Sequence, residues 1–193
     1  MLWQSPLVNK VGSAFVNGRA RSESEVKIFT VGHSTRTIEE FLELLHGHGV
    51  QAIADVRTIP KSRHNPQFGE GLGESLRADD IDYAHFRSLG GLRRSTDNDV
   101  NGAWRNSSFR GYADHMQTDE FEDGINGLRA MAAQCRTAIM CAEALPWRCH
   151  RSLIGDALVV RGDDVLDIMS TRGVKPHTLT SFAHVDGTRL TYP

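Results

Sequence analysis

Two kinds of hydrophobic pattern alternate along the chain and predict strands and helices in turn. Short apolar runs that are rich in β-branched residues and bounded by polar residues or glycine are typical of buried strands. Such runs occupy residues 26–31, 51–56, 81–86, 137–141 and 165–169. Because helical segments separate these runs, and because parallel neighbours need a crossover connection, the pattern favours a mostly parallel sheet of about five strands.

The helical segments have apolar residues three and four positions apart, and several have recognisable ends. Thr37 and Glu40 form a capping box ahead of the first helix, which is predicted to end near residues 47–49. Asp119 and Glu122 predict the start of another helix in the same way. Further helices are predicted to end at Arg77 and to cover residues 109–116 and about 149–161.

The two ends of the chain depart from this alternation. Residues 1–25 show no sustained period, which predicts a loosely ordered N-terminal extension. Near the other end, Asp186 and Gly187 lie between two strand-like arms and predict a C-terminal hairpin or extended tail. We therefore expect a single α/β domain over residues 26–193, with helices on both faces of the sheet in a three-layer α/β/α arrangement.

The composition narrows the classes of function. A net charge of -2 excludes the basic excess of proteins that nucleic acid or anionic lipid holds by bulk charge, so an anion site would be local. The 3 cysteines are too few for a disulfide framework and fit a reducing compartment. The N-terminus has no basic region ahead of an apolar core, and no apolar run approaches the roughly 20 residues of a membrane span. We expect a cytoplasmic protein without a membrane partner, and the sequence indicates no oligomeric state.

Reactive side chains are densest between the fourth predicted strand and the helix that follows it. Cys141 and Glu143 are two positions apart, so they share a face if the extended backbone continues. Cys149, His150 and Arg151 stand at the predicted helix start, where free N–H groups favour an anion and a cysteine tends to have a lowered pKa. Ligands of open parallel sheets bind at this carboxyl edge.

The ends of the first two predicted strands add further polar groups. Because the carboxyl ends of parallel strands meet at one edge, we expect all of these side chains to converge there. The predicted catalytic residues are Cys141, Glu143, Cys149 and Asp55, with a thiol as nucleophile and a carboxylate as general base. The predicted ligand-binding residues are His33, Ser34, Arg57, Arg63, Tyr83, His150 and Arg151.

The order of these motifs resembles that of a known family. Residues 30–34 (TVGHS) follow the first strand, residues 55–57 (DVR) follow the second, and a C-x-E, P, C-H-R pattern runs from Cys141 to Arg151. Together they are similar to the family catalogued as domain of unknown function 488, over about residues 26–193. The resemblance implies a small prokaryotic α/β protein without a settled activity. It supports the fold and the site and adds no reaction.

The residue types favour an enzyme or ligand-binding domain for a small anionic compound, including one that bears phosphate. Arginines and a helix N-terminus would bind the anion, while thiol, acid and base groups would carry out the chemistry. The spacing disfavours a cysteinyl-phosphate mechanism, because Cys141 and Arg148 are one residue further apart than in the loop of tyrosine phosphatases.

Two alternatives stay open at this point. The first is a metal-binding protein or metalloenzyme with zinc or iron on Cys141, Glu143, Cys149 and His150, although adjacent ligands are awkward and no C-x-x-C pair is present. The sequence does not itself require a cofactor. The second is a nucleic-acid interaction through residues 86–110, where arginines are interleaved with aromatic residues. Acidic residues in that loop and the net charge make this alternative the less favoured one.

Overall fold

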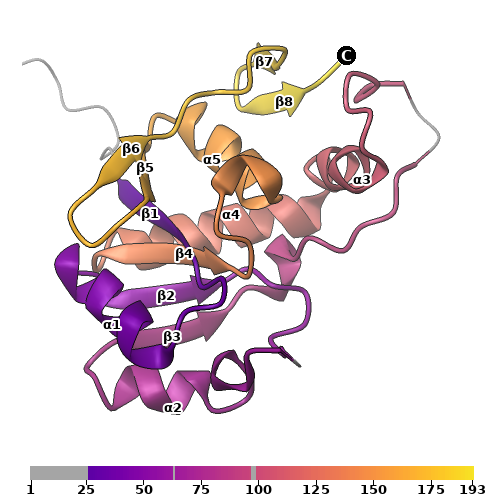
Figure 1. Cartoon of the computed structure of the whole chain (residues 1–193). Helices are drawn as coiled ribbons and strands as arrows, with labels where there is room; N and C mark the ends of the chain where they lie inside the picture. The colour runs from indigo at the N-terminus through magenta and orange to yellow at the C-terminus, as the bar shows by residue number, and fades with distance from the viewer. Residues whose placement is uncertain (1–25, 63, 97–98) are drawn as a thin grey trace, which may run out of the picture.

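The computed structural model describes residues 26–62, 64–96 and 99–193, which form three layers around one six-stranded sheet (Figure 1). The predicted extension at residues 1–25 lies outside the described residues. The sheet has the strand order β3-β2-β4-β1-β5-β6. Its strands are β1 (Lys27–Gly32), β2 (Ala52–Asp55), β3 (Asp82–His85), β4 (Thr137–Cys141), β5 (Asp164–Ile168) and β6 (Val174–Pro176).

Helices cover both faces of the sheet because successive strand residues point to opposite sides. On β1, Ile28 packs into one hydrophobic cluster, whereas Phe29 and Val31 pack into the other. The Phe29 side is covered by α1 (Ile38–Gly47) and α2 (Leu72–Arg77). The Ile28 side is covered by α3 (Ser107–His115), α4 (Asp119–Ala132) and α5 (Arg151–Val159). The prediction of a three-layer α/β/α fold is confirmed.

The sheet register brings three of the sequence motifs to one edge. Strands β1 to β5 are all parallel to one another, and β4 lies between β1 and β2. Gly32 at the end of β1 pairs with Cys141 at the end of β4, and Asp55 at the end of β2 pairs with Met140. The loops that leave these strands therefore start side by side at the carboxyl edge.

The structure adds a strand to the predicted set and moves one helix cap by a residue. Strand β6 pairs antiparallel with β5 and was absent from the predicted set, because its three residues are all exposed and end in Pro176, so they show no apolar pattern. The capping box of Thr37 and Glu40 is confirmed. Helix α4 begins at Asp119, and its N-cap is Thr118, whose hydroxyl accepts the Phe121 N–H. The cap therefore lies one residue before the capping position predicted at Asp119.

The predicted C-terminal hairpin is confirmed as a separate two-stranded sheet. It consists of β7 (His184–Asp186) and β8 (Arg189–Thr191), with Gly187 at φ 60° in the turn, a backbone conformation that glycine adopts without strain. Tyr192, which follows the hairpin, is fully buried and donates its hydroxyl to Asp156 of α5 at 2.9 Å. Within the described part of the chain, every helix is too short or too polar to span a bilayer.

Candidate functional site

A cavity of about 960 Å³ opens at the carboxyl edge of the sheet, and a space of this size holds a small organic molecule. Its walls come from the ends of β1 and β4, from the loop after β2, from residues 91–92 and 108–109, and from the segment before α5. Seven of the predicted site residues line it: His33, Ser34, Arg57, Cys141, Glu143, Cys149 and His150.

Three other predicted site residues do not line this cavity. Asp55 is fully buried beneath Arg57, and Tyr83 lines a smaller cavity of about 400 Å³ beside α2. Arg151 is 1% exposed and points into the protein. Arg63 lies outside the described residues, although its neighbour His64 lines the main cavity.

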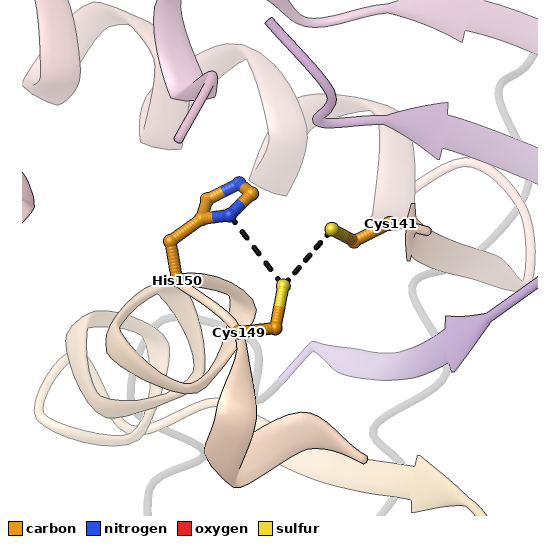
Figure 2. Close-up of side chains that lie close together, drawn as sticks. All are labelled: Cys141, Cys149 and His150. Carbon is orange, nitrogen blue, oxygen red and sulfur yellow. Dashed lines mark hydrogen bonds between the residues drawn. The ribbon is translucent and has the colours of Figure 1, made fainter. Parts of the chain in front are cut away.

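Two cysteines and a histidine form the floor of the cavity. The Cys149 thiol donates to the Cys141 sulfur at 2.9 Å, and the Cys149 sulfur lies 3.5 Å from Nδ1 of His150. Figure 2 shows the Cys149 sulfur between the other two side chains. The three ligand atoms lie within 4.8 Å of one another, and both sulfurs are buried. We call these residues the Cys-Cys-His cluster.

The backbone before α5 explains why adjacent residues reach the same point. Side chains next to each other in an extended segment point to opposite sides. Cys149 is extended, at φ -135° and ψ 147°, but His150 is already helical, at φ -52° and ψ -18°. This change of conformation turns the imidazole back toward the Cys149 sulfur. Adjacent ligands, which the sequence analysis called awkward, therefore reach one point here because the backbone changes conformation between them.

The two thiols have opposite pKa shifts. The hydrogen bond from Cys149, and then the proximity of His150, hold the pKa of Cys141 well below its usual range in spite of burial. The pKa of Cys149 is raised because this thiol donates to Cys141 and is buried. Of the two thiols, the one at Cys141, at the end of β4, is therefore the first to lose its proton.

Contacts around His150 fix its ring. Nε2 lies 2.9 Å from the carbonyl oxygen of Val56, which only accepts, so Nε2 carries the proton of this hydrogen bond. In the neutral ring, Nδ1 is then an acceptor that faces the sulfurs. Gly91 packs against the ring so closely that a Cβ there would lie 2.4 Å from Nδ1. The imidazole is therefore held between the end of β2 and the loop at Gly91.

Arg57 and Asp55 form a buried pair that supports the cavity wall. The guanidinium donates to both carboxylate oxygens at 2.5–3.1 Å and to the carbonyl oxygen of Phe68 at 2.8 Å. Tyr83 donates its hydroxyl to the same carboxylate at 2.8 Å. Asp55 is thus committed to neighbouring groups and does not reach the cavity, which leaves Glu143 as the lining carboxylate among the described residues.

The histidine at the end of β1 is oriented by the same pair. His33 donates from Nδ1 to the carbonyl oxygen of Ser34 at 2.8 Å, and its Nε2 lies 3.4 Å from Arg57. Its ring stacks on Phe68 with 4.1 Å between centroids. Burial lowers the pKa of His33, and the positive charge of Arg57 acts in the same direction.

Arg151 ties the strand ends together. Its guanidinium donates to the carbonyl oxygens of Val31 in β1 and of Glu143 and Ala144 in the loop after β4. Gly32, the last residue of β1, lets this loop come close, because a Cβ there would lie 1.9 Å from the Glu143 carbonyl oxygen. Arg151 therefore positions the Cys141–Glu143 segment and does not line the cavity.

The start of α5 also differs from the predicted anion site. The N–H of Arg151 donates to the Cys149 sulfur, and the N–H of Ser152 donates to the Cys149 carbonyl oxygen. The first amides of the helix thus have partners within the chain.

The cavity contains residues that the sequence analysis did not select. Lys61 and Arg148 add two cations, and Ile59, Leu92 and Phe109 add an apolar wall. Lys61 pairs with the exposed Glu70 at 2.8 Å, whereas no hydrogen bond or ion pair of the Arg148 side chain is found with the described residues. Arg148 falls inside the densest motif, so the sequence could have indicated it as a site residue. The apolar residues come from loops without a hydrophobic period, so the sequence did not indicate them.

The arginine-rich loop is used mainly in packing. Trp104 stacks on Phe109 with 4.8 Å between centroids and makes edge contacts with Phe182 and Tyr192. Arg93 donates to Glu120 and to the carbonyl oxygens of residues 87, 88 and 90. The Arg93 guanidinium and the Trp104 ring are therefore engaged within the protein.

Comparison with known proteins gives one match. The family model described as Domain of unknown function DUF488 matches residues 37–158, which include α1, β2, β4 and the Cys-Cys-His cluster but leave out His33 and Ser34. No curated protein and no solved structure matches the chain.

Proposed function

This chain belongs to the DUF488 family, whose description names no activity, and we propose from the cavity itself that it is an enzyme acting on a small organic anion. The observation that carries the proposal is the position of the Cys-Cys-His cluster at the floor of a cavity large enough for such a molecule. A reactive cluster, a cationic rim and an apolar wall then face the same space.

The charges of the rim favour an anionic substrate. Among the described residues that line the cavity, the cations are Arg57, Lys61 and Arg148, and the carboxylate is Glu143. Because Asp55 and Glu70 neutralise the first two, Arg148 is the group most available to a ligand. A guanidinium binds carboxylate or phosphate through two parallel hydrogen bonds.

The apolar wall favours an organic body over an inorganic ion. Leu92 is 75% exposed and Ile59 is 57% exposed, although both are large hydrophobic residues that would ordinarily be covered. They face the same cavity as Phe109. A substrate with an apolar part would cover this wall while its anionic group lies against Arg148 and its reacting atom lies over the cluster.

Ligand binding tests the proposal. Phenyl phosphate, benzoate, inorganic phosphate and neutral benzyl alcohol are titrated against the full chain, with calorimetry and the melting temperature as readouts. We expect the aromatic anions to bind more tightly than inorganic phosphate and benzyl alcohol to bind weakest. Arg148→Ala is expected to weaken anion binding about tenfold or more.

A matched variant controls for the loss of one positive charge. Arg172→Ala removes an exposed arginine that does not line the cavity, so it should leave binding unchanged. The proposal is wrong if none of the organic anions binds, or if the two arginine variants weaken binding equally.

A further inference from the structure

We propose that the Cys-Cys-His cluster is a zinc site in which Cys141, Cys149 and Nδ1 of His150 hold one ion and the remaining coordination position faces the cavity. The binding of the ion follows from the cluster alone. Only the role of the open position rests on the proposed function, because the ion would attract the anionic substrate or a water molecule there.

The donor set matches zinc. Two thiolates and one imidazole are ligands that zinc prefers, and three protein ligands with one open position are typical of catalytic zinc sites. The 3.5 Å between the Cys149 sulfur and Nδ1 of His150 fits two ligands of one ion. The two sulfurs lie 2.9 Å apart in their hydrogen bond, and they must separate to the roughly 3.8 Å that two Zn–S bonds of about 2.3 Å set at a tetrahedral angle. Both thiols lose their protons when such an ion binds.

The surroundings of the cluster hold the ligand atoms in place. A histidine that binds a metal usually donates its other ring N–H to a carbonyl or carboxylate, and His150 donates Nε2–H to Val56 in this way. The Arg151 N–H donates to the Cys149 sulfur at 3.5 Å, and the Arg151 side chain fixes the loop after Cys141. Direct hydrogen bonds thus hold two of the three ligands, His150 and Cys149, in orientations that face the same point.

The fourth position is open to the cavity. Among the residues that the structure describes, no further histidine, cysteine or carboxylate joins the group of three. All three members line the cavity, so an ion bound between them faces the space that also contains Arg148 and Glu143. A closed structural site would have a fourth protein ligand.

Metal binding by the full chain tests the inference. The chain is reduced, freed of metal with a chelator, and titrated with zinc against a chromophoric competitor in the absence of any organic anion. We expect one zinc per chain, bound more tightly than micromolar. Cobalt in place of zinc is expected to give the intense charge-transfer absorption of thiolate ligation together with the visible bands of a tetrahedral site.

Variants assign the ligands. Cys141→Ser and Cys149→Ser are each expected to lose zinc affinity by more than about 100-fold, which exceeds the effect of an outer contact, and to keep about half of the thiolate absorption at saturating cobalt, because one thiolate of the two remains. His150→Gln keeps a side chain of similar length and is expected to weaken binding while retaining that absorption. Cys135→Ser is the matched control, because Cys135 is a free cysteine outside the cluster. Circular dichroism of the metal-free variants checks that each one folds.

Two results would overturn the inference. One is a wild-type chain that is fully reduced and folded and takes up no zinc at micromolar concentration. This result does not depend on whether any variant folds. The other is a Cys135→Ser variant that loses as much affinity as Cys149→Ser. Anion binding that still depends on Arg148 in such a chain would leave the proposed function standing, whereas tight zinc binding without anion binding would refute only the proposed function.

Discussion

The environment of His177 predicts that stability depends on pH in a defined direction. This histidine follows β6, and its side chain is 7% exposed. Nε2 lies 2.9 Å from Asp156 of α5, and Nδ1 lies 3.5 Å from Asp167 of β5. Burial by itself would lower the pKa of His177, but the hydrogen bonds and charges of these two carboxylates outweigh it and raise the pKa to about 9.

The size of the effect follows from the two pKa values. In the unfolded chain the pKa of His177 is the ordinary 6.5, so the folded state binds the proton more tightly. The difference corresponds to about 3 kcal/mol of stability, present in full below pH 6.5 and lost as the pH rises through about 9. The stabilising form is the imidazolium, which lies between the two carboxylates.

Urea unfolding at pH 6, 8 and 10 measures this contribution. His177→Asn keeps a polar side chain but cannot become charged, so the stability difference between wild type and variant isolates the histidine. We expect that difference to shrink by about 3 kcal/mol between pH 6 and pH 10. His46→Asn is the matched control, since the side chain of His46 is 55% exposed in its pair with Asp79 and should contribute less than about 1 kcal/mol.

A flat difference would refute the reasoning. If wild type and His177→Asn lose stability in parallel from pH 6 to pH 10, the two carboxylates do not hold a charged imidazole. The expected sign is seen if wild type is more stable than the variant at pH 6 and this difference has largely disappeared at pH 10.

Two further substitutions test how the cavity is built. Gly91→Ala places a Cβ 2.4 Å from Nδ1 of His150, so we expect zinc affinity to fall at least about tenfold. Gly71→Ala is the control, because a Cβ there meets nothing within 4 Å and should leave zinc affinity unchanged. Equal affinities of the two variants in a zinc titration would contradict this prediction. Arg57→Met leaves the buried Asp55 carboxylate without its guanidinium partner and should lower the free energy of unfolding by about 3–5 kcal/mol. Adding Asp55→Asn should restore part of this free energy. A loss below about 1 kcal/mol in urea unfolding of Arg57→Met would disprove the role of the pair.

Much of the fold was predictable from the sequence because local rules and tertiary packing agree. The runs at residues 137–141 and 51–56 are buried on both faces, so their apolar character is continuous and easy to read. Thr37 and Glu40 cap α1 through contacts within one turn, which need no information from the rest of the chain. Strand β6 was missed because its three residues are exposed and it joins the sheet by backbone pairing with β5 at the edge.

The sequence predicted many of the residues that form the candidate site but not how their side chains are oriented. Parallel strands place their carboxyl ends at one edge, so the convergence of Cys141 with Cys149 and His150 follows from motif positions once the sheet is parallel. The chain order does not say which polar groups turn toward each other. Arg57 and Arg151 were expected to bind a ligand, yet one is paired with Asp55 and the other donates to buried carbonyl oxygens.

The sequence by itself determined the alternation of strands and helices, the parallel sheet and the edge at which reactive side chains gather, because each depends on local periodicity and on the handed geometry of the backbone. Only the tertiary structure decided which of those side chains face the cavity and which pair with other groups of the protein. Burial makes an unpaired charge costly, so Arg57 and Arg151 are drawn to Asp55 and to backbone carbonyls, while the change of backbone angle at Cys149 and His150 turns two neighbours toward Cys141. Those choices depend on partners many residues away, and the order of residues along the chain does not contain their distances.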